Sequence, residues 1–265
     1  MIERSTVGSL LRCTQAFSQQ ICDKETLQYG IAFSSSRFPQ LPDANQFREV
    51  TVGNREQTIA AVEEGLAWFT GRNLSCHVVA PAIGQSTADF ELALAPHGFA
   101  LRRFAALRLT RWADLPSPAD IRVLPARAMR SAVRDSFLAD PGIPAPARES
   151  AAEAFAERLD DSALDTFVAL VNGKTAGRCA LYQVGDLARV MDLVVLPPYR
   201  AAAVDSALLH QTLGLARRLA IKHVLAQVNA AFEARLAWLL QSGFEHDGEI
   251  VEFHASAAPL SGDVR

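Results

Sequence analysis

The spacing of apolar residues in the first half of the chain predicts helices and short strands. Between residues 59 and 69 apolar side chains recur every three or four positions, which is typical of an amphipathic helix. Asn54 and Gln57 are placed to form a capping box at its start, and Gly71 is placed to end it. We also expect helices over residues 10–22 and 86–98, with Pro96 ending the second, strands over residues 29–33, 77–80 and 100–110, and a loop over residues 34–47.

The second half predicts an α/β fold, in the form of an α+β mixed sheet. Three strand-like runs follow one another over residues 165–171, 175–184 and 188–196. Asn172-Gly173 and Gly185-Asp186 separate them, and such pairs are typical of tight hairpin turns. Further strands are expected over residues 121–124, 224–228 and 249–254, and helices over residues 129–137, 148–161, 206–221 and 232–241.

The two halves share a local pattern. HVVAP, from residue 77, is followed by a helical run and Gly98-Phe99, and HVLAQVN, from residue 223, is followed by a helical run and Gly243-Phe244. A strand, a helix and a Gly-Phe corner thus recur at nearly one offset, which favours two copies of one fold. Residues 113–119 (ADLPSPA) form a proline-rich break, so we divide the chain into domains 1–115 and 116–265.

Composition narrows the class of protein. The chain has 265 residues, of which 49% are hydrophobic, and its formal net charge is −3. It can therefore bury one large core or two modest ones, and no basic excess favours nucleic acid or a membrane surface. The start lacks the apolar core of a signal peptide, no apolar run is long enough for a membrane span, and the four cysteines form no Cys-x-x-Cys pair. We expect a reduced, cytoplasmic protein without a metal site.

The segment Asp192-Leu193-Val194-Val195-Leu196-Pro197, followed by Tyr199-Arg200, is the most informative in the chain. Further on come Ala207-Leu208-Leu209, Ala216, Val228-Asn229 and Gly243-Phe244. In this order the residues resemble the GCN5-related N-acetyltransferase (GNAT) family. In that family the strand with the first motif splays from its neighbour and hydrogen-bonds the pantetheine arm of coenzyme A (CoA), and the following loop wraps the pyrophosphate.

The resemblance implies two GNAT-like acyl-CoA N-acyltransferase folds in tandem. The first, over residues 1–115, would be degenerate, and the second, over residues 116–265, would bind acetyl-CoA or another acyl-CoA. Arg200 is suited to pair with a phosphate in a bidentate manner. The implied cofactor-binding residues are Val194, Val195, Leu196, Arg200, Ala201, Ala202, Ala203, Val204, Asp205, Ser206 and Asn229.

Two positions of the loop depart from the family pattern. Ala203 and Asp205 stand where the family carries glycine or a small residue, which lets the backbone approach a phosphate. Ala203 is tolerable there if its φ is negative. The carboxylate of Asp205 would repel a pyrophosphate, although it is equally suited to a helix cap or first turn. Asn229 would orient the ligand or cap the next helix.

The acid and the base of such a reaction are less evident. Leu239 occupies the position at which many family members carry a tyrosine that protonates the leaving thiolate, and leucine has no proton to donate. Tyr182 and Tyr199 are the tyrosines of the second half, and neither has that position. Asp192 is the candidate catalytic base, the alternative being an exposed strand-edge acid. Glu245, His246 and Asp247 are further candidates for the base, the alternative being a solvated loop. Arg217, Arg218 and Lys222 are candidates for binding a 3′-phosphate, the alternative being a solvated helix face. We expect a structural role for His210 and His223.

These features support three functional hypotheses. In the first, the chain is an acyl-CoA-dependent N-acyltransferase that acts on a small amine in the groove between its domains, as a monomer or homodimer without nucleic-acid or membrane partners. In the second, the lost glycines and tyrosine mark a degenerate, non-catalytic ligand-binding or scaffold protein. In the third, the fold performs other acyl-thioester chemistry.

Overall fold

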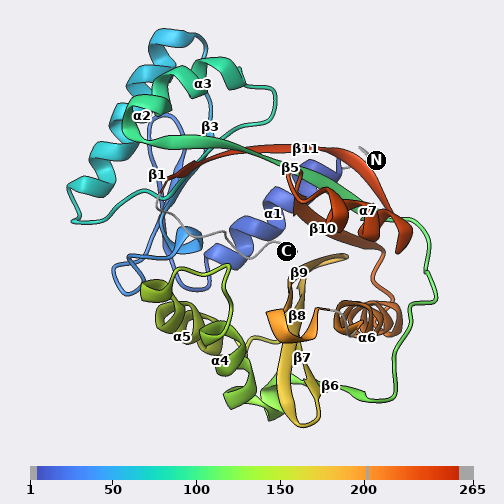
Figure 1. Cartoon of the computed structure of the whole chain (residues 1–265). Helices are drawn as coiled ribbons and strands as arrows, with labels where there is room; N and C mark the ends of the chain where they lie inside the picture. Colours follow the sequence, from blue (N-terminus) through green and yellow to red (C-terminus); the bar gives the residue numbers. More distant parts are fainter. Residues whose placement is uncertain (1–4, 201–202, 257–265) are drawn as a thin grey trace. The chain divides into compact units, whose positions relative to one another are not determined.

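The computed structural model describes residues 5–200 and 203–256 (Figure 1). They form two compact units. The larger unit contains residues 5–16 and 104–249, and the smaller unit contains residues 17–103 and 250–256. Two strands, β5 (Phe99–Leu109) and β11 (Phe244–Ala255), have residues in both units. The predicted domain boundary between residues 115 and 116 is a different division, because it separates two copies of one fold along the sequence. This boundary stays a prediction.

The larger unit is built on a mixed sheet with the strand order β11-β5-β10-β9-β8-β7-β6. Neighbours from β6 to β9 are antiparallel, β9 and β10 are parallel, and β10 and β5 are antiparallel. The strands are β6 (Ile121–Pro125), β7 (Leu164–Val171), β8 (Lys174–Val184), β9 (Leu187–Val195) and β10 (His223–Asn229). The helices are α1 (Thr6–Ser18), α4 (Arg130–Leu138), α5 (Arg148–Arg158), α6 (Val204–Arg218) and α7 (Glu233–Gln241).

Helices cover both faces of this sheet. Figure 1 shows α4 and α5 on one side of β7 and β8 and α6 on the other, and both α4 and α6 contact β8. Alternate residues of β8 therefore face different helices. A Cβ atom on Gly177 would meet side chains of α6, whereas the Arg178 side chain reaches the carbonyl of Ser136 in α4. The core lies between the sheet and α6, where Ala207, Leu208 and Leu209 are fully buried.

The smaller unit has the strand order β1-β2-β3-β4-β11-β5. It contains β1 (Asp23–Thr26), β2 (Ile31–Ser34), β3 (Gln46–Val50), β4 (Val78–Pro81), α2 (Arg55–Thr70) and α3 (Thr87–Leu94). Phe47, Val79 and Phe253, from three neighbouring strands, are buried in one apolar cluster with Phe90 of α3. Two polar residues stand next to these phenylalanines in the sequence, Arg48 after Phe47 and Glu252 before Phe253. They form a buried ion pair of 2.8 Å.

Several local predictions are confirmed. Asn54 accepts a hydrogen bond from the Gln57 backbone N–H, as expected of the N-cap of α2. The Gln57 side chain accepts one from Gly53, the residue before Asn54, for which the capping box was expected. α3 ends at Leu94, shortly before Pro96. Asn172 and Gly173 both have positive φ values, 51° and 75°, as a tight turn between β7 and β8 requires.

Other predictions are wrong in their bounds. The last strand begins at Phe244 and not at residue 249, because Glu245, His246 and Asp247 are polar and exposed although they belong to the sheet. β3 lies partly in the stretch expected to be a loop, and β1 was not expected because all of its residues are exposed. The first helix spans residues 6–18 and not 10–22. None of the described helices is both long and apolar enough to span a bilayer.

Candidate functional site

β9 and β10 part within the larger unit. Their parallel pairing runs from Leu187 opposite His223 to Val190 opposite Ala226, and then ends. β9 continues to Val195 and β10 to Asn229. In this described part of the chain the facing edges of Leu193–Val195 and of residues 227–229 are therefore not paired with each other. Such an edge presents backbone N–H and C=O groups that can hydrogen-bond a ligand.

A bulge in β9 coincides with this parting. On β8, Ala180 pairs with Met191 and Arg178 with Val194, so two residues of β9 lie opposite the single residue Cys179. The first of them, Asp192, has a left-handed backbone with φ 55°. β-bulges of this kind bend a strand and increase its local twist. The bend thus occurs where β9 leaves β10.

A glycine allows the close packing next to this bulge. A Cβ atom on Gly177 would lie 2.4 Å from the Val194 carbonyl oxygen and 3.2 Å from a Leu208 methyl group. Any side chain at this position would push β9 or α6 away. Gly177 therefore fixes the position of Val194 relative to β8 and α6.

Asp192 is not available as a free carboxylate. It is 5% exposed, and both of its oxygens accept hydrogen bonds of 3.1 Å from the guanidinium of Arg178. It is therefore not the exposed strand-edge acid that was the alternative interpretation. Its assignment as a base stays a prediction, and these contacts favour a positioning role. Arg178 attracted no attention in the sequence, because a lone arginine in a strand gives no sign of its burial.

The turn from β9 into α6 contains a strained residue. Leu196 donates its backbone N–H to Ala176 (2.9 Å), residues 197–199 form a 3₁₀ turn, and Arg200 is exposed. Ala201 and Ala202, both predicted to bind cofactor, lie outside the described residues. Ala203 has φ 51° and ψ 27°, so the condition under which we expected alanine to be tolerable, a negative φ, is not met. A left-handed alanine costs about 1–2 kcal/mol.

The first turn of α6 has no side-chain cap at its N-cap residue, Ala203. Asp205 instead lies in the turn itself, where Oδ1 accepts the N–H of Ser206 (2.8 Å) and Oδ2 pairs with Nη1 of Arg235 in α7 (3.3 Å). Burial lowers the pKa of Arg235, Asp205 counteracts this, and the positive charge of Arg200 lowers that pKa further. Arg200 and Arg235 therefore act on the same region, and the charge of Asp205 is already neutralised.

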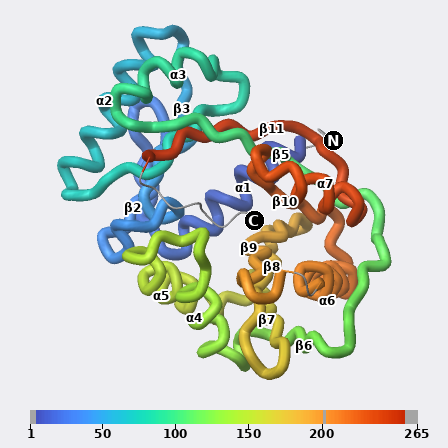
Figure 2. The backbone as a smooth tube through the Cα atoms, in the orientation of Figure 1, coloured from blue at the N-terminus to red at the C-terminus, as the bar shows by residue number. Residues whose placement is uncertain are grey.

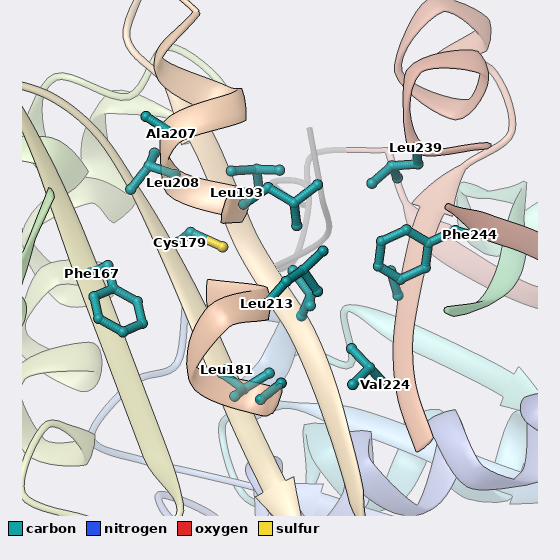
Figure 3. Close-up of a cluster of buried hydrophobic side chains, with 14 of the residues drawn as sticks. Phe167, Cys179, Leu181, Leu193, Ala207, Leu208, Leu213, Val224, Leu239 and Phe244 are labelled. Carbon is teal, nitrogen blue, oxygen red and sulfur yellow. The ribbon is translucent and has the colours of Figure 1, made fainter. Parts of the chain in front are cut away.

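The end of β10 and α7 provide no proton donor at the expected position. The Asn229 side chain accepts the N–H of Ala231 (2.9 Å), so it supports the turn before α7. It does not cap that helix, whose N-cap residue is Phe232, and its role in orienting a ligand stays a prediction. Leu239 is fully buried in the core with Phe244, Leu213 and Val224 (Figure 3). Cys179 lies in the same core, and burial raises the pKa of its thiol to about 12. None of these side chains can donate a proton to a leaving thiolate at neutral pH.

Comparison with known proteins decides what these elements are. The model of the acetyltransferase (GNAT) family matches residues 128–244. This range contains β9, β10, α6, α7 and the bulge at Asp192. The chain carries a GNAT domain.

Solved structures agree with this assignment at the level of the fold. A GCN5-related N-acetyltransferase from Kribbella flavida matches with a TM-score of 0.62 and 11% identity, over 97% of each chain. One from Sphaerobacter thermophilus matches with a TM-score of 0.61 and 16% identity, over 96% of this chain and 93% of that chain. A tandem GNAT protein from the clavulanic acid biosynthesis pathway matches with a TM-score of 0.55 and 18% identity, over 88% of this chain and 80% of that chain. No curated protein sequence gives a significant match.

The GNAT domain indicates an acetyltransferase and supports, in general terms, acyl transfer from an acyl-CoA to an amine. Within it the structure brings several candidates together: Val194, Val195 and Leu196 at the parting strands and Ala203, Val204, Asp205 and Ser206 at the start of α6. Sequence reasoning missed Arg178 and Arg235. The sequence predicts that Arg235 lies on the same helix as Leu239, one turn before it. It gives no sign that Arg235 pairs with Asp205, which is 30 residues away.

The remaining candidates of the GNAT domain and its surroundings lie elsewhere. Glu245 and His246 are exposed on β11, and Asp247 contacts Thr6 (2.7 Å) and Arg108 (3.6 Å). His210 and Arg217 line a cavity of about 240 Å³ together with residues 112–115. Residues 112–115 belong to the connection from β5 to β6, whose course Figure 2 shows. Arg218, Lys222 and His223 are exposed. No group of side chains suited to bind a metal occurs among the described residues.

Proposed function

We propose that this chain is an N-acyltransferase that takes an acyl group, acetyl in the first instance, from acyl-CoA and transfers it to a small amine. One observation carries the proposal: β9 and β10 part directly before the turn into α6, inside the GNAT domain. An unpaired strand edge and a helix N-terminus thus follow one another in the chain. The first suits an amide-containing arm and the second suits a phosphate.

The residues of the chain fit this cofactor in part. The backbone of Leu193–Val195 is free of β10 and can hydrogen-bond the pantetheine arm. The N–H groups at the start of α6, Arg200 and Arg235 suit the pyrophosphate. Ala203 and Asp205 fit less well, since one is strained and the other is anionic. The fit is sufficient for binding, with an affinity limited by these two residues.

The chemistry needs few groups from the protein. Acyl-CoA supplies a thioester, whose carbonyl carbon forms a bond to the amine nitrogen as the C–S bond breaks. Because Arg178 holds both oxygens of Asp192, we assign the proton lost by the amine to water. Because Leu239 has no proton to give, the leaving sulfur also takes its proton from water. The contribution of the chain is therefore mainly binding and orientation.

The test is isothermal titration calorimetry with acetyl-CoA. Saturable binding is expected, and Arg200→Ala should weaken it about tenfold through loss of a charge-assisted contact. The matched control is Arg122→Ala, an exposed arginine on the edge strand β6, which should leave the affinity within about twofold because β6 lies three strands away from β9. Absence of binding by the wild-type protein at high micromolar acetyl-CoA would contradict the proposal.

A second function, that of a non-catalytic binding module, is favoured by the strain at Ala203 and by the buried Leu239. The two functions separate in a double variant, Ala203→Gly with Asp205→Gly. If the wild-type protein binds no acetyl-CoA and this variant does, the loop has degenerated and the binding module is the better description. If the variant also fails to bind, degeneration of the loop is not the reason.

A further inference from the structure

Arg178 is a buried charge that the proposed function does not yet use. It lies in β8 and is the largest fully buried side chain among the residues that the structure describes. A buried guanidinium is costly unless its hydrogen bonds and its charge are satisfied. Here burial alone would lower the pKa of Arg178, but Asp192 and Asp140 outweigh this effect and raise it. The group is therefore a permanent cation inside the larger unit.

The contacts of Arg178 point in two directions. Toward β9, Nε and Nη2 donate to the two oxygens of Asp192, both at 3.1 Å. Toward α4, Nη2 donates to Asp140 (2.8 Å), Nη1 donates to the Ser136 carbonyl (3.0 Å), and the guanidinium lies 3.7 Å from the Phe137 ring centroid. One side chain therefore connects the bulge of β9 to the end of α4.

The Asp192 end of this bridge is the left-handed residue of the bulge. Aspartate is one of the few residues with a side chain that adopt a left-handed backbone, and it does so as a single residue whose conformation the surroundings hold in place. A bidentate arginine fixes both the position and the orientation of a carboxylate. The pair thus holds Asp192 in the backbone conformation that bends β9.

The bulge is also the point from which β9 diverges from β10. Val190 is the last residue of β9 that pairs with β10. Asp192 follows two positions later, and Leu193–Val195 have a free edge on the side of β10. On the other side of β9, Val194 is paired with Arg178 itself. Arg178 therefore contacts the bulge through its side chain and the free-edge segment through its backbone.

We propose that Arg178 is the positioning residue of the ligand-binding strand, because it holds the Asp192 bulge that turns Leu193–Val195 away from β10. Asp192 then serves as the anchor of this strand and not as the base. Arg178 touches neither cofactor nor substrate and acts through Asp192. The consequence for CoA rests on the proposed function, whereas the consequence for the order of β9 does not.

The experiment compares Asp192→Asn with its matched control, Asp140→Asn. Asparagine keeps the size of aspartate and tolerates a left-handed backbone, so each variant removes one carboxylate charge from Arg178 and little else. The difference is that Asp192 belongs to β9, whereas Asp140 follows α4. Two readouts apply to both variants: hydrogen exchange of peptides that cover residues 190–196, and the Kd for CoA.

Asp192→Asn is expected to accelerate exchange in residues 190–196 at least about tenfold and to raise the Kd for CoA by a similar factor. Asp140→Asn is expected to change the exchange rate and the Kd each by less than about threefold, even if it lowers the free energy of unfolding as much as Asp192→Asn does. Equal effects of the two variants on exchange, or none in β9, would overturn the positioning role. Arg178→Lys, which keeps the charge but lacks the bidentate fork, should reproduce the exchange result if Asp192→Asn is too unstable. Failure of the wild type to bind CoA would count against the proposed function alone.

Discussion

Single residues determine how well the start of α6 can receive an anion. Ala203 brings the chain into α6 with a left-handed backbone, and Asp205 occupies the first turn with its own carboxylate. Arg235 neutralises that carboxylate, so the expected repulsion of a phosphate is weaker than Asp205 alone would produce. Anion binding at this site is therefore limited by the strain of Ala203 and by the Asp205 carboxylate, which competes for the start of α6. A lack of positive charge does not limit it.

Ala203→Gly should stabilise the protein. Glycine adopts positive φ without the cost that alanine incurs, and the gain outweighs the added freedom of the unfolded chain, so a net gain of about 0.5–1 kcal/mol is expected. The measurement is the free energy of unfolding in urea. Ala60→Gly, at an exposed helical position of α2, is the control and should lose about 1 kcal/mol. A loss in both variants would show that Ala203 is not strained.

Asp205→Asn should raise the affinity for CoA about 3- to 10-fold, because it frees Arg235 and removes a negative charge beside the helix N-terminus. Arg235→Ala should lower the affinity by a similar factor. Pantetheine, which lacks the phosphates, should bind equally to the wild type and both variants. The opposite order of the two variants, or an equal effect with pantetheine, would contradict a phosphate site at this turn.

Helix ends and turns that depend on neighbouring residues were predicted correctly from the sequence, whereas contacts between distant elements were not. The N-cap at Asn54, the helix stop at Pro96 and the turn at Asn172 depend on neighbours in sequence, which is why they were readable. β1 is exposed along its whole length, and the first half of β11 is polar, so neither shows the alternation that marks a strand. The site followed the same rule: β9 and α6 were predicted, but the partners of Asp192 and Asp205 come from elements 14 and 30 residues away.

β3 and β11 are joined by an ion pair that makes stability depend on pH. Arg48 and Glu252 have side chains that are 5% and 3% exposed, and His254 contacts the second Glu252 oxygen at 2.9 Å. Burial opposes ionisation of Glu252, but Arg48 and His254 outweigh it and hold the pKa of Glu252 well below its usual value. The pair therefore contributes stability above the unfolded-state pKa of about 4.3, and this contribution is lost as the pH falls toward the lower folded-state pKa.

Glu252→Gln should lower the free energy of unfolding by about 3–5 kcal/mol at pH 7, because it leaves Arg48 as a buried, uncompensated charge. It should also reduce the loss of stability that the wild type shows between about pH 5 and pH 3. Denaturant unfolding at a series of pH values measures both effects. Glu91→Gln, at an exposed position of α3, should change stability by less than about 0.5 kcal/mol. An unchanged pH dependence in Glu252→Gln would show that the ion pair is not its source.

At the scale of the whole molecule, the sequence echo corresponds to repeated local structure. β4, α3, Gly98 and β5 follow one another in the first half, and β10, α7, Gly243 and β11 follow one another in the second. Both glycines have positive φ, 76° and 98°, and a phenylalanine starts the next strand in each case. A tandem GNAT protein has a similar fold over 88% of this chain. That the chain holds two copies of one fold stays a proposal, which this repeated local structure supports, and residues 128–244 match the family model.

Hydrogen exchange with and without saturating acetyl-CoA tests whether an acyl-CoA binds between the parted strands and the start of α6. Slower exchange is expected in peptides that cover residues 193–207, with no change in residues 23–34 of β1 and β2. Unchanged exchange over residues 193–207 at saturation, or protection confined to other segments, would contradict binding at this site.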